Sequence, residues 1–213
     1  MVELVDTLGS GPRTRKGVQV QVLFRAFFIF CKRGYASLFY LSFLLKYAII
    51  YLMSDYVRPT WDEYFMEVSR TIAKRATCDR GRSGCVIARD NQILVTGYVG
   101  SPAGLPHCDD VGHLLRKSLH ADGSVTQHCV RTVHAEQNAI CQAAKRGIPI
   151  DGATLYCKMT PCRTCAMLII NCGIKRVVCE KHYHDEEDSL EMFKQAGIKI
   201  EHVEDEVQTY ENM

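Results

Sequence analysis

His134-Ala-Glu136, followed 25 residues later by Pro161-Cys-Arg-Thr-Cys165, is the most informative feature of this chain. One imidazole and two thiolates make a three-ligand zinc site, in which the fourth tetrahedral position is left for water. Zinc lowers the pKa of that water, so hydroxide is available to attack an electron-poor carbon. A carboxylate two residues from the histidine can take the water's proton and pass it on. We therefore predict His134, Cys162 and Cys165 as metal ligands and Glu136 as the catalytic residue.

The spacing of the two cysteines suits the same chemistry. Cys162 and Cys165 are three residues apart, which places both sulfurs on one side of the first turn of a helix. Proline is common at the start of a helix, and Pro161 directly precedes the two cysteines. A helix N-terminus also favours the thiolate form of cysteine over the thiol. A structural zinc knot or a chance pair of cysteines is the alternative. The H-x-E and P-C-x-x-C halves, in this order, are typical of zinc-dependent nucleobase deaminases and favour the catalytic interpretation.

The first 53 residues differ from the rest of the chain. Residues 35–53 are almost wholly apolar, which makes the run about long enough to span a bilayer. A signal peptide is disfavoured, because no small-residue cleavage site follows before Asp55. Residues 1–10 and 17–23 resemble the peptides that arise when a tRNA gene is translated, and Met53 would then be the true start. We favour this interpretation over a membrane anchor and expect the functional domain to occupy residues 54–213.

Charge and cysteine usage narrow the class of protein. Residues 1–53 hold seven Lys/Arg and two Asp/Glu, which leaves 19 basic and 22 acidic side chains, net −3, on the other 160. A mildly acidic domain gives no sign of the basic surface that binds a polynucleotide backbone. We therefore expect no nucleic-acid partner, and we also expect no membrane partner. Ten of the eleven cysteines lie in this domain and suit metal binding or a core. That usage indicates a reducing compartment, the cytoplasm.

The pattern of helices and strands predicts an α/β fold. Thr60-Trp-Asp-Glu63 is a capping box that opens a helix, in which Trp61, Phe65, Val68 and Ile72 recur at helical spacing and predict a buried face. The other predicted elements are a hairpin of strands 85–88 and 93–98, helices over 134–146, 162–171 and 189–196, and strands over 154–158, 176–179 and 198–202. Residues 101–127 are predicted as an inserted loop. Strands that alternate with helices imply a three-layer αβα domain with a central mixed sheet of about five strands.

Several motifs in register resemble those of the deoxycytidylate (dCMP) deaminases, within the cytidine/deoxycytidylate deaminase superfamily. The resemblance covers roughly residues 58–203 and rests on the stretches 58–66, 77–80, 97–102, 107–108, 134–140, 161–166, 169–175 and 183–184. It implies the cytidine-deaminase fold and conversion of dCMP to dUMP with release of ammonia, which supplies dUMP for thymidylate synthesis. It also implies a homo-oligomer, usually a hexamer, with feedback by dCTP and dTTP together with Mg²⁺.

Other functions share parts of this pattern. Deaminases of tRNA adenosine, guanine or free cytidine carry similar zinc motifs. The tRNA and guanine enzymes typically lack the Trp61-Asp-Glu-Tyr-Phe65 opening and the inserted loop, and the tRNA enzyme needs a basic surface. A non-catalytic, zinc-stapled binding module would leave Glu136 without a purpose.

The resemblance also suggests residues for a second zinc and for the substrate. The matching positions for a second zinc are Cys78, Cys108, His128 and Cys129, with His107 and His113 in reserve; ordinary loop histidines and free thiols are the alternative. Tyr183 matches an aromatic residue that lies against the substrate base in the family, although a surface tyrosine is equally compatible. The family's Gly-Tyr motif, here Gly97-Tyr98, usually continues with a substrate-contacting Asn, but this chain has Val99.

One further residue and two short stretches receive weaker interpretations. Asn138, four residues after His134, lies on the same helix face and either meets the substrate or satisfies a neighbouring backbone group. Ser83-Gly-Cys85 replaces the family's Val-Gly-Ala, a small-residue change that we attribute to packing. Residues 185–188 are predicted to be a solvated loop and a helix start.

Overall fold

The structure, a computed structural model, describes Lys46, residues 57–119, Gly123 and residues 125–208. Residues from Pro59 onward form a compact unit of their own. The predictions for residues 1–53, a spurious upstream segment or a membrane anchor, lie outside the described residues apart from Lys46. Within the described ranges, no helix is both long enough and apolar enough to cross a membrane.

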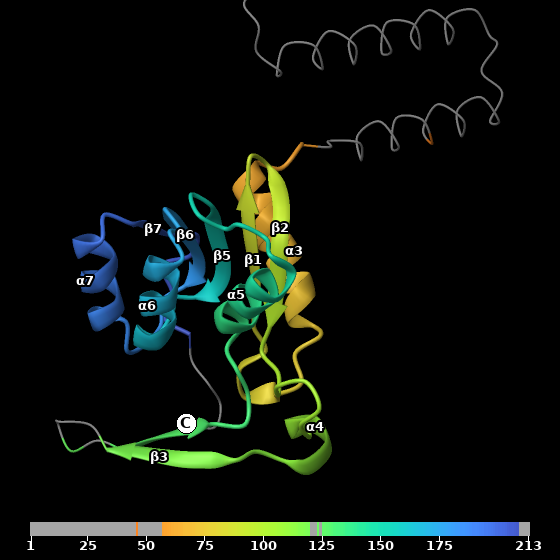
Figure 1. Cartoon of the computed structure of the whole chain (residues 1–213), viewed down its shortest axis with the longest axis vertical. Coiled ribbons are helices and arrows are strands. Elements are labelled where there is room, and N and C mark those ends of the chain that lie inside the picture. The colour runs from red at the N-terminus through yellow and green to blue at the C-terminus, as the bar shows by residue number, and fades with distance from the viewer. Residues whose placement is uncertain (1–45, 47–56, 120–122, 124, 209–213) are drawn as a thin grey trace, which may run out of the picture. The chain divides into compact units, whose positions relative to one another are not determined.

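A five-stranded mixed sheet forms the centre of this unit (Figure 1). Its strands run in the order β2-β1-β5-β6-β7. β1 pairs antiparallel with both β2 and β5, whereas the pairs β5–β6 and β6–β7 are parallel. The strands are β1 (Gly84–Arg89), β2 (Gln92–Tyr98), β5 (Thr154–Met159), β6 (Arg176–Lys181) and β7 (Lys199–His202). The predicted sheet of about five strands is confirmed, including the hairpin of β1 and β2.

Helices cover both faces of the sheet, as the alternating side chains of its strands require. The residues Ile87, Leu155 and Val177 face one cluster of buried side chains, to which α5 (Ala135–Arg146), α6 (Arg163–Asn171) and α7 (Glu187–Gln195) contribute. Their neighbours Val86, Tyr156 and Val178 face a second cluster, to which α3 (Trp61–Ala73) contributes Phe65 and Met66. The three-layer αβα prediction is therefore confirmed.

Helix α3 begins at the predicted capping box. The Thr60 hydroxyl accepts a hydrogen bond from the Glu63 backbone N–H at 3.2 Å, and the Glu63 carboxylate accepts one from the Thr60 N–H at 2.7 Å. The buried face was expected to begin at Trp61, but this side chain is 45% exposed. Its ring stacks on Phe65 instead, with centroids 5.7 Å apart, because the first turn of the helix lies at the edge of the core.

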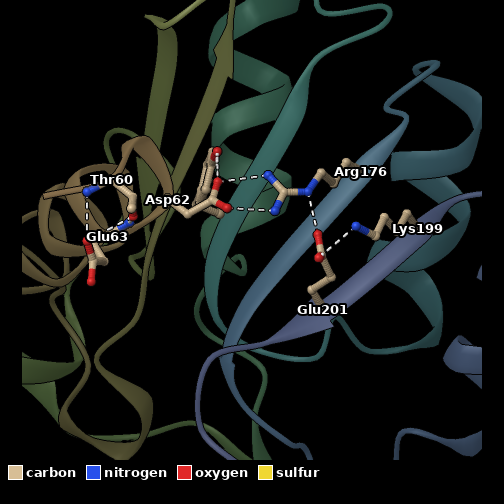
Figure 2. A network of polar contacts seen from close by, with 7 residues as sticks. Thr60, Asp62, Glu63, Arg176, Lys199 and Glu201 are labelled. Carbon is tan, nitrogen blue, oxygen red and sulfur yellow. Dashed lines mark hydrogen bonds and ion pairs between the residues drawn. The ribbon is translucent and has the colours of Figure 1, made fainter. Parts of the chain in front are cut away.

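A polar network joins α3 to three strands of the sheet (Figure 2). Both Asp62 carboxylate oxygens accept hydrogen bonds from the Arg176 guanidinium, at 2.8 and 2.7 Å, and the Tyr156 hydroxyl donates to Asp62 at 2.7 Å. Arg176 also donates to Glu201, which pairs with Lys199 at 2.8 Å. This network ties α3 to strands β5, β6 and β7 through one bidentate ion pair.

The inserted segment is more regular than predicted. Residues 101–127 were expected to form a loop, but they include α4 (Cys108–Val111), β3 (Leu115–Leu119) and most of β4 (Val125–Cys129). β3 and β4 pair antiparallel, from Leu115 opposite Cys129 to Leu119 opposite Val125. Every residue of β3 is exposed, so the hairpin has no alternating apolar pattern from which it could have been predicted. A short 3-10 turn, η1 (Asp79–Gly81), precedes β1.

Candidate active site

Two glycine-dependent contacts set the position of the helix that carries His134 and Glu136. A Cβ atom at Gly97 of β2 would lie 2.2 Å from the Ala135 carbonyl oxygen and 2.4 Å from the Ala139 nitrogen. Only glycine allows so close an approach, and the first turn of α5 therefore packs directly on β2. His134 is the N-cap of this helix, and its backbone N–H donates to the Gln137 side chain at 3.0 Å.

The second half of the motif lies at the start of α6. Cys162 is the N-cap of this helix and Cys165 lies in its first turn, buried against the core. Cys162 and Cys165 were predicted to share one side of a helical turn, and the structure places both sulfurs beside the imidazole of His134. The distances from His134 Nδ1 are 3.5 Å to Cys162 Sγ and 3.4 Å to Cys165 Sγ.

These distances suit a tetrahedral zinc ion. Zn–S bonds of about 2.3 Å and a Zn–N bond of about 2.0 Å, at a tetrahedral angle, separate the nitrogen from each sulfur by about 3.5 Å. The three donor atoms also lie within 4.8 Å of one another. Three protein ligands leave one tetrahedral position open, which is the pattern of catalytic rather than structural zinc sites. The donor set therefore fits the metal that the sequence predicts.

The three donor residues differ in their ionisation. Hydrogen bonding from Cys165 and His134 lowers the pKa of Cys162 to about 4, against the opposing effect of burial. The contact with Cys162 raises the pKa of His134 to about 9. The hydrogen bond between Cys162 and Cys165, together with burial, raises the pKa of the Cys165 thiol. A thiolate at the N-terminus of α6 is the form that binds a metal ion.

Glu136 lies beside the three donors without being one of the group. Its side chain is 7% exposed, and its Oε2 atom lies 3.7 Å from Cys165 Sγ. Burial raises the pKa of the Glu136 carboxyl, with His134 acting in the opposite direction. A carboxyl group whose pKa is raised in this way is suited both to accept and to deliver a proton.

A cleft opens over His134, Cys162 and Glu136. It is lined by residues from the η1 turn, from β4, from the segment before α6 and from the loop after β6; these include Arg80, Val99, His128, His134, Glu136, Thr160, Cys162, Tyr183 and His184. Val99 and Tyr183, two of the predicted substrate residues, thus line the cleft. Tyr98 and Asn138 are not among the lining residues. The Asn138 amide instead donates to the Tyr98 carbonyl at 2.9 Å, which fixes α5 to β2.

A second group of possible metal ligands joins the inserted segment to the body. Cys78, Cys108 and Cys129, all predicted, lie together with His113. The Cys108 and Cys129 sulfurs are 3.5 Å apart, close to the roughly 3.8 Å expected between two sulfurs on one zinc ion. His113 Nδ1 lies 3.6 Å from Cys78 Sγ, and its Nε2 lies 3.0 Å from an Asp79 carboxylate oxygen. A carboxylate on the far nitrogen is the usual support of a metal-bound histidine.

His128 takes no part in this group, and His113 occupies the place predicted for it. His128 and Cys129 are neighbours in β4, and successive side chains of a strand point to opposite faces. His128 is not one of the four residues of this group; its Nε2 lies 2.8 Å from the Thr126 hydroxyl, and the residue lines the cleft. His107, the other alternative ligand predicted for the second zinc, is exposed at the N-cap of α4.

The thiols of this second group differ in ionisation. Burial is the main reason that the pKa of Cys108 rises to about 12. Burial also acts on Cys129, but hydrogen bonds from the backbone of Arg131 and Leu114 outweigh it and lower the pKa of Cys129 to about 7. One thiol in the group is thus prepared to ionise near neutral pH, as metal binding requires.

The fold and the site together define the class of cytidine-deaminase-like αβα proteins: a mixed sheet with a His-x-Glu helix and a Cys-x-x-Cys helix side by side at one cleft. The chain belongs to the cytidine and deoxycytidylate deaminase family, whose zinc-binding region matches residues 59–181.

Relatives from several organisms agree with this assignment. The chain is 42% identical over 147 residues to ComE operon protein 2 of Bacillus subtilis, covering 69% of this chain and 73% of that protein. It is 36% identical over 143 residues to the deoxycytidylate deaminase of Schizosaccharomyces pombe, covering 67% of this chain but only 44% of that enzyme. The structure of dCMP deaminase from cyanophage S-TIM5 in complex with dCMP and dUMP superposes with a TM-score of 0.55 at 27% identity, covering 70% of this chain and all of that one.

Three features of the site were not predicted from the sequence. Arg80 lies in the quoted stretch 77–80, where a basic residue beside a predicted metal ligand was the available signal. Thr160 precedes Pro161 directly and is buried in the wall of the cleft. A third group of possible metal ligands, His182, Glu186 and His202, comes from three separate elements, so no local pattern indicates it.

Proposed function

We propose that this chain hydrolyses the amino group of dCMP, giving dUMP and ammonia, at a zinc ion held by His134, Cys162 and Cys165. The observation that carries the proposal is the placement of one nitrogen and two sulfur donors at tetrahedral spacing beside the buried carboxyl of Glu136. Membership of the deaminase family and the printed substrate of the cyanophage relative support the same reaction.

The protein's own groups account for the proton transfers. Zinc, when bound, supplies Lewis-acid activation of a water molecule at neutral pH. Glu136 takes a proton from that water and delivers it to the ring nitrogen beside the reacting carbon. The same carboxyl then takes the remaining proton of the attacking oxygen and delivers it to the departing amino group. The bond from carbon to the water oxygen forms, the bond from carbon to nitrogen breaks, and ammonia leaves.

The walls of the cleft suit a small nucleotide. Tyr183 offers an aromatic ring for the pyrimidine, as the resemblance implies. Arg80, His128 and His184 line the same cleft and supply basic groups for a phosphate. Val99 lies where the family usually has an amide, so we propose that another residue makes the deoxyribose contact and that dCMP is preferred over CMP.

The proposal includes the second zinc and leaves Mg²⁺ to an effector. Among the described residues, each group able to hold a metal ion contains histidine or cysteine, and these ligands suit zinc rather than Mg²⁺. Mg²⁺ would therefore enter only with dCTP or dTTP, bound to a cytoplasmic homo-oligomer, as the resemblance implies. Titration of the purified protein with each nucleotide, with and without Mg²⁺, tests that regulation.

One assay tests the proposed reaction. The purified full chain is incubated separately with dCMP, CMP, deoxycytidine and tRNA, and released ammonia is measured for each. We expect turnover of dCMP to exceed that of the other three. Preference for tRNA, or for an aminated base other than cytosine, would overturn the proposal.

A further inference from the structure

Glu186, at the N-cap of α7, is a hydrogen-bonded acceptor in a stretch predicted to be solvated. Its side chain is only 17% exposed. One carboxylate oxygen accepts from the Tyr183 backbone N–H at 3.2 Å and from the Thr160 hydroxyl, and the other lies 2.7 Å from His182 Nδ1. Burial acts to raise the pKa of Glu186, but these hydrogen bonds outweigh it and hold the pKa below its usual range. The group is therefore a charged acceptor at neutral pH.

Thr160 links this carboxylate to the wall of the cleft. Its side chain is 3% exposed, and its single hydroxyl proton is donated to Glu186. His202 Nε2, 2.9 Å from the same hydroxyl oxygen, must then donate to it, which makes a chain from His202 through Thr160 to Glu186. The Thr160 backbone N–H donates to the Lys181 carbonyl at 3.2 Å. Thr160, which directly precedes Pro161 and Cys162, is thus held by hydrogen bonds of both its side chain and its backbone.

The two histidines in this cluster favour hydrogen bonding over metal binding. The rings of His182 and His202 stack with centroids 3.7 Å apart and an angle of 15° between their planes. The nitrogen lone pairs lie in the ring planes, so two nearly parallel rings cannot direct them at one ion without rotating. His182 Nε2 also lies 3.3 Å from Asp205 and His202 Nε2 lies 3.9 Å from Glu186, so carboxylates already surround the pair.

The geometry points to Glu186 as a positioning residue that holds two walls of the substrate cleft together: the Tyr183 loop on one side and the Thr160–Cys162 segment on the other. Both Tyr183 and Thr160 line the cleft. The Glu186 carboxylate accepts a hydrogen bond from the backbone N–H of Tyr183 and another from the side-chain hydroxyl of Thr160. Glu186 itself is not among the lining residues, so its effect passes through these two. This inference rests on the proposed function, because it takes the cleft as the dCMP site.

A comparison of Glu186→Ala with Glu187→Ala tests the role. Both changes remove a carboxylate from the start of α7, but the Glu187 side chain is exposed. We expect Glu186→Ala to raise KM for dCMP about tenfold, the loss typical of one hydrogen bond to a charged group. Its kcat and zinc content should stay within about twofold of the wild type. A looser contact between the Tyr183 ring and the pyrimidine weakens binding of the ground state and of the transition state alike. Glu187→Ala should leave KM unchanged.

A double-mutant cycle separates positioning from a general structural effect. If Glu186 acts through Tyr183, adding Glu186→Ala to Tyr183→Ala should raise KM by much less than tenfold. A full tenfold effect in the Tyr183→Ala background would overturn the inference, and so would KM values equal for Glu186→Ala and Glu187→Ala. Loss of one zinc equivalent in Glu186→Ala would make the cluster a metal site instead. Glu186→Gln, which keeps the shape and one acceptor oxygen, should give a smaller KM rise if the alanine variant does not fold.

Hydrogen–deuterium exchange keeps this test independent of the reaction. Removing the acceptor of the Tyr183 amide should speed exchange in the peptide that contains residues 182–185, and leave the peptides of α5 unchanged. If wild type fails to deaminate dCMP but exchange rises as expected, the proposed function is wrong and the positioning role stands. Unchanged exchange in Glu186→Ala would rule out the positioning role whatever the substrate.

Discussion

Glu136 combines burial with proximity to the predicted zinc ligands, and these two properties determine its chemistry. Among the described residues that are buried, it is the one with an ionisable carboxyl. Burial raises its pKa, so the group accepts a proton from water more readily than an exposed carboxylate does and can then return it.

We expect Glu136→Gln to abolish most turnover while the metal stays bound. The amide keeps the shape of the side chain but cannot carry a proton, so kcat should fall by about 10²- to 10⁴-fold. The donor atoms come from His134, Cys162 and Cys165, so zinc content per chain should equal that of the wild type. Steady-state kinetics on dCMP and metal analysis of the same preparation measure both. Loss of zinc in this variant would show that Glu136 is a ligand or a structural residue.

Val99→Asn tests how the cleft tells deoxyribose from ribose. Val99 lines the cleft but also packs against the main core cluster. An amide that faces the nucleotide gains a hydrogen bond, and the ratio of kcat/KM for dCMP over CMP should change by about tenfold. An amide that faces the core instead stays unpaired and lowers the free energy of unfolding by about 1–3 kcal/mol. An unchanged ratio with that loss of stability would exclude a substrate contact at position 99.

At the scale of secondary-structure elements, the close contact between β2 and α5 places the catalytic helix. In Gly97→Ala, the new Cβ atom would meet backbone atoms of α5, and backbone cannot move aside as a flexible side chain can. We expect α5 to shift, with a loss of about 1–3 kcal/mol in stability and a clear fall in kcat. Urea unfolding and kinetics on the folded fraction measure the two effects.

Gly84→Ala is the matched control for this prediction. Its Cβ atom would lie 2.2 Å from the Ser69 carbonyl oxygen in α3, on the opposite face of the sheet. A similar loss of stability is expected there, but kcat of the folded enzyme should hold, because α3 carries none of the three metal donors. Equal losses of kcat in both variants would show that general destabilisation, and not the position of α5, limits activity.

The inserted hairpin depends on its cross-link to the body. Because every residue of β3 is exposed, the hairpin buries little apolar surface, and a metal ion at Cys78, Cys108, His113 and Cys129 would supply the missing constraint. We expect His113→Ala to lose one zinc equivalent per chain and to become sensitive to proteolysis within residues 113–130. His128→Ala should keep its full zinc content and raise KM instead, since His128 lines the cleft. The opposite pattern of zinc loss would restore the ligand set predicted from the sequence.

The sequence predicts the elements of the body well and those of the insert poorly, for a physical reason. Capping at Thr60, the His134 and Cys162 helix starts and the alternating strands are local signals, each carried by residues close together in the chain. The β3–β4 hairpin carries no such local signal, and Cys78, Cys108, His113 and Cys129 come together only in the folded chain. The role of Glu186 depends on β6, β7 and the segment before α6 meeting at one point.

At the scale of the whole molecule, polar pairs between residues distant in sequence connect a helical layer to the sheet. The apolar pattern predicts that these layers pack together, but it does not predict such pairs. Asp62 and Arg176 are 114 residues apart, so nothing in the sequence pairs them, although the fold brings their side chains into bidentate contact (Figure 2). The apolar alternation of the strands is sufficient to predict three layers. It does not determine the angle at which α3 crosses the sheet, for which the Asp62–Arg176 contact provides a fixed point.

Asp62→Asn should lower the stability of the whole unit in a pH-dependent way. The hydrogen bond from Arg176 is the main reason that the pKa of Asp62 is lowered, and the pKa of Glu201 is lowered by Lys199 and Arg176. A lowered folded-state pKa contributes stability above the unfolded value of about 4, and this contribution is lost as pH falls through the folded value.

Because the Asp62 side chain is 42% exposed, we expect a loss of only about 1 kcal/mol at pH 7. In urea unfolding at pH 7 and pH 3, the difference in the free energy of unfolding between Asp62→Asn and wild type should be smaller at pH 3, because the charge of wild-type Asp62 contributes less to stability below the unfolded pKa of about 4. Glu191→Gln, at an exposed carboxylate on α7, should show little difference at either pH. A gap of equal size at both pH values would mean that Asp62 acts through packing and neutral hydrogen bonds rather than through its charge.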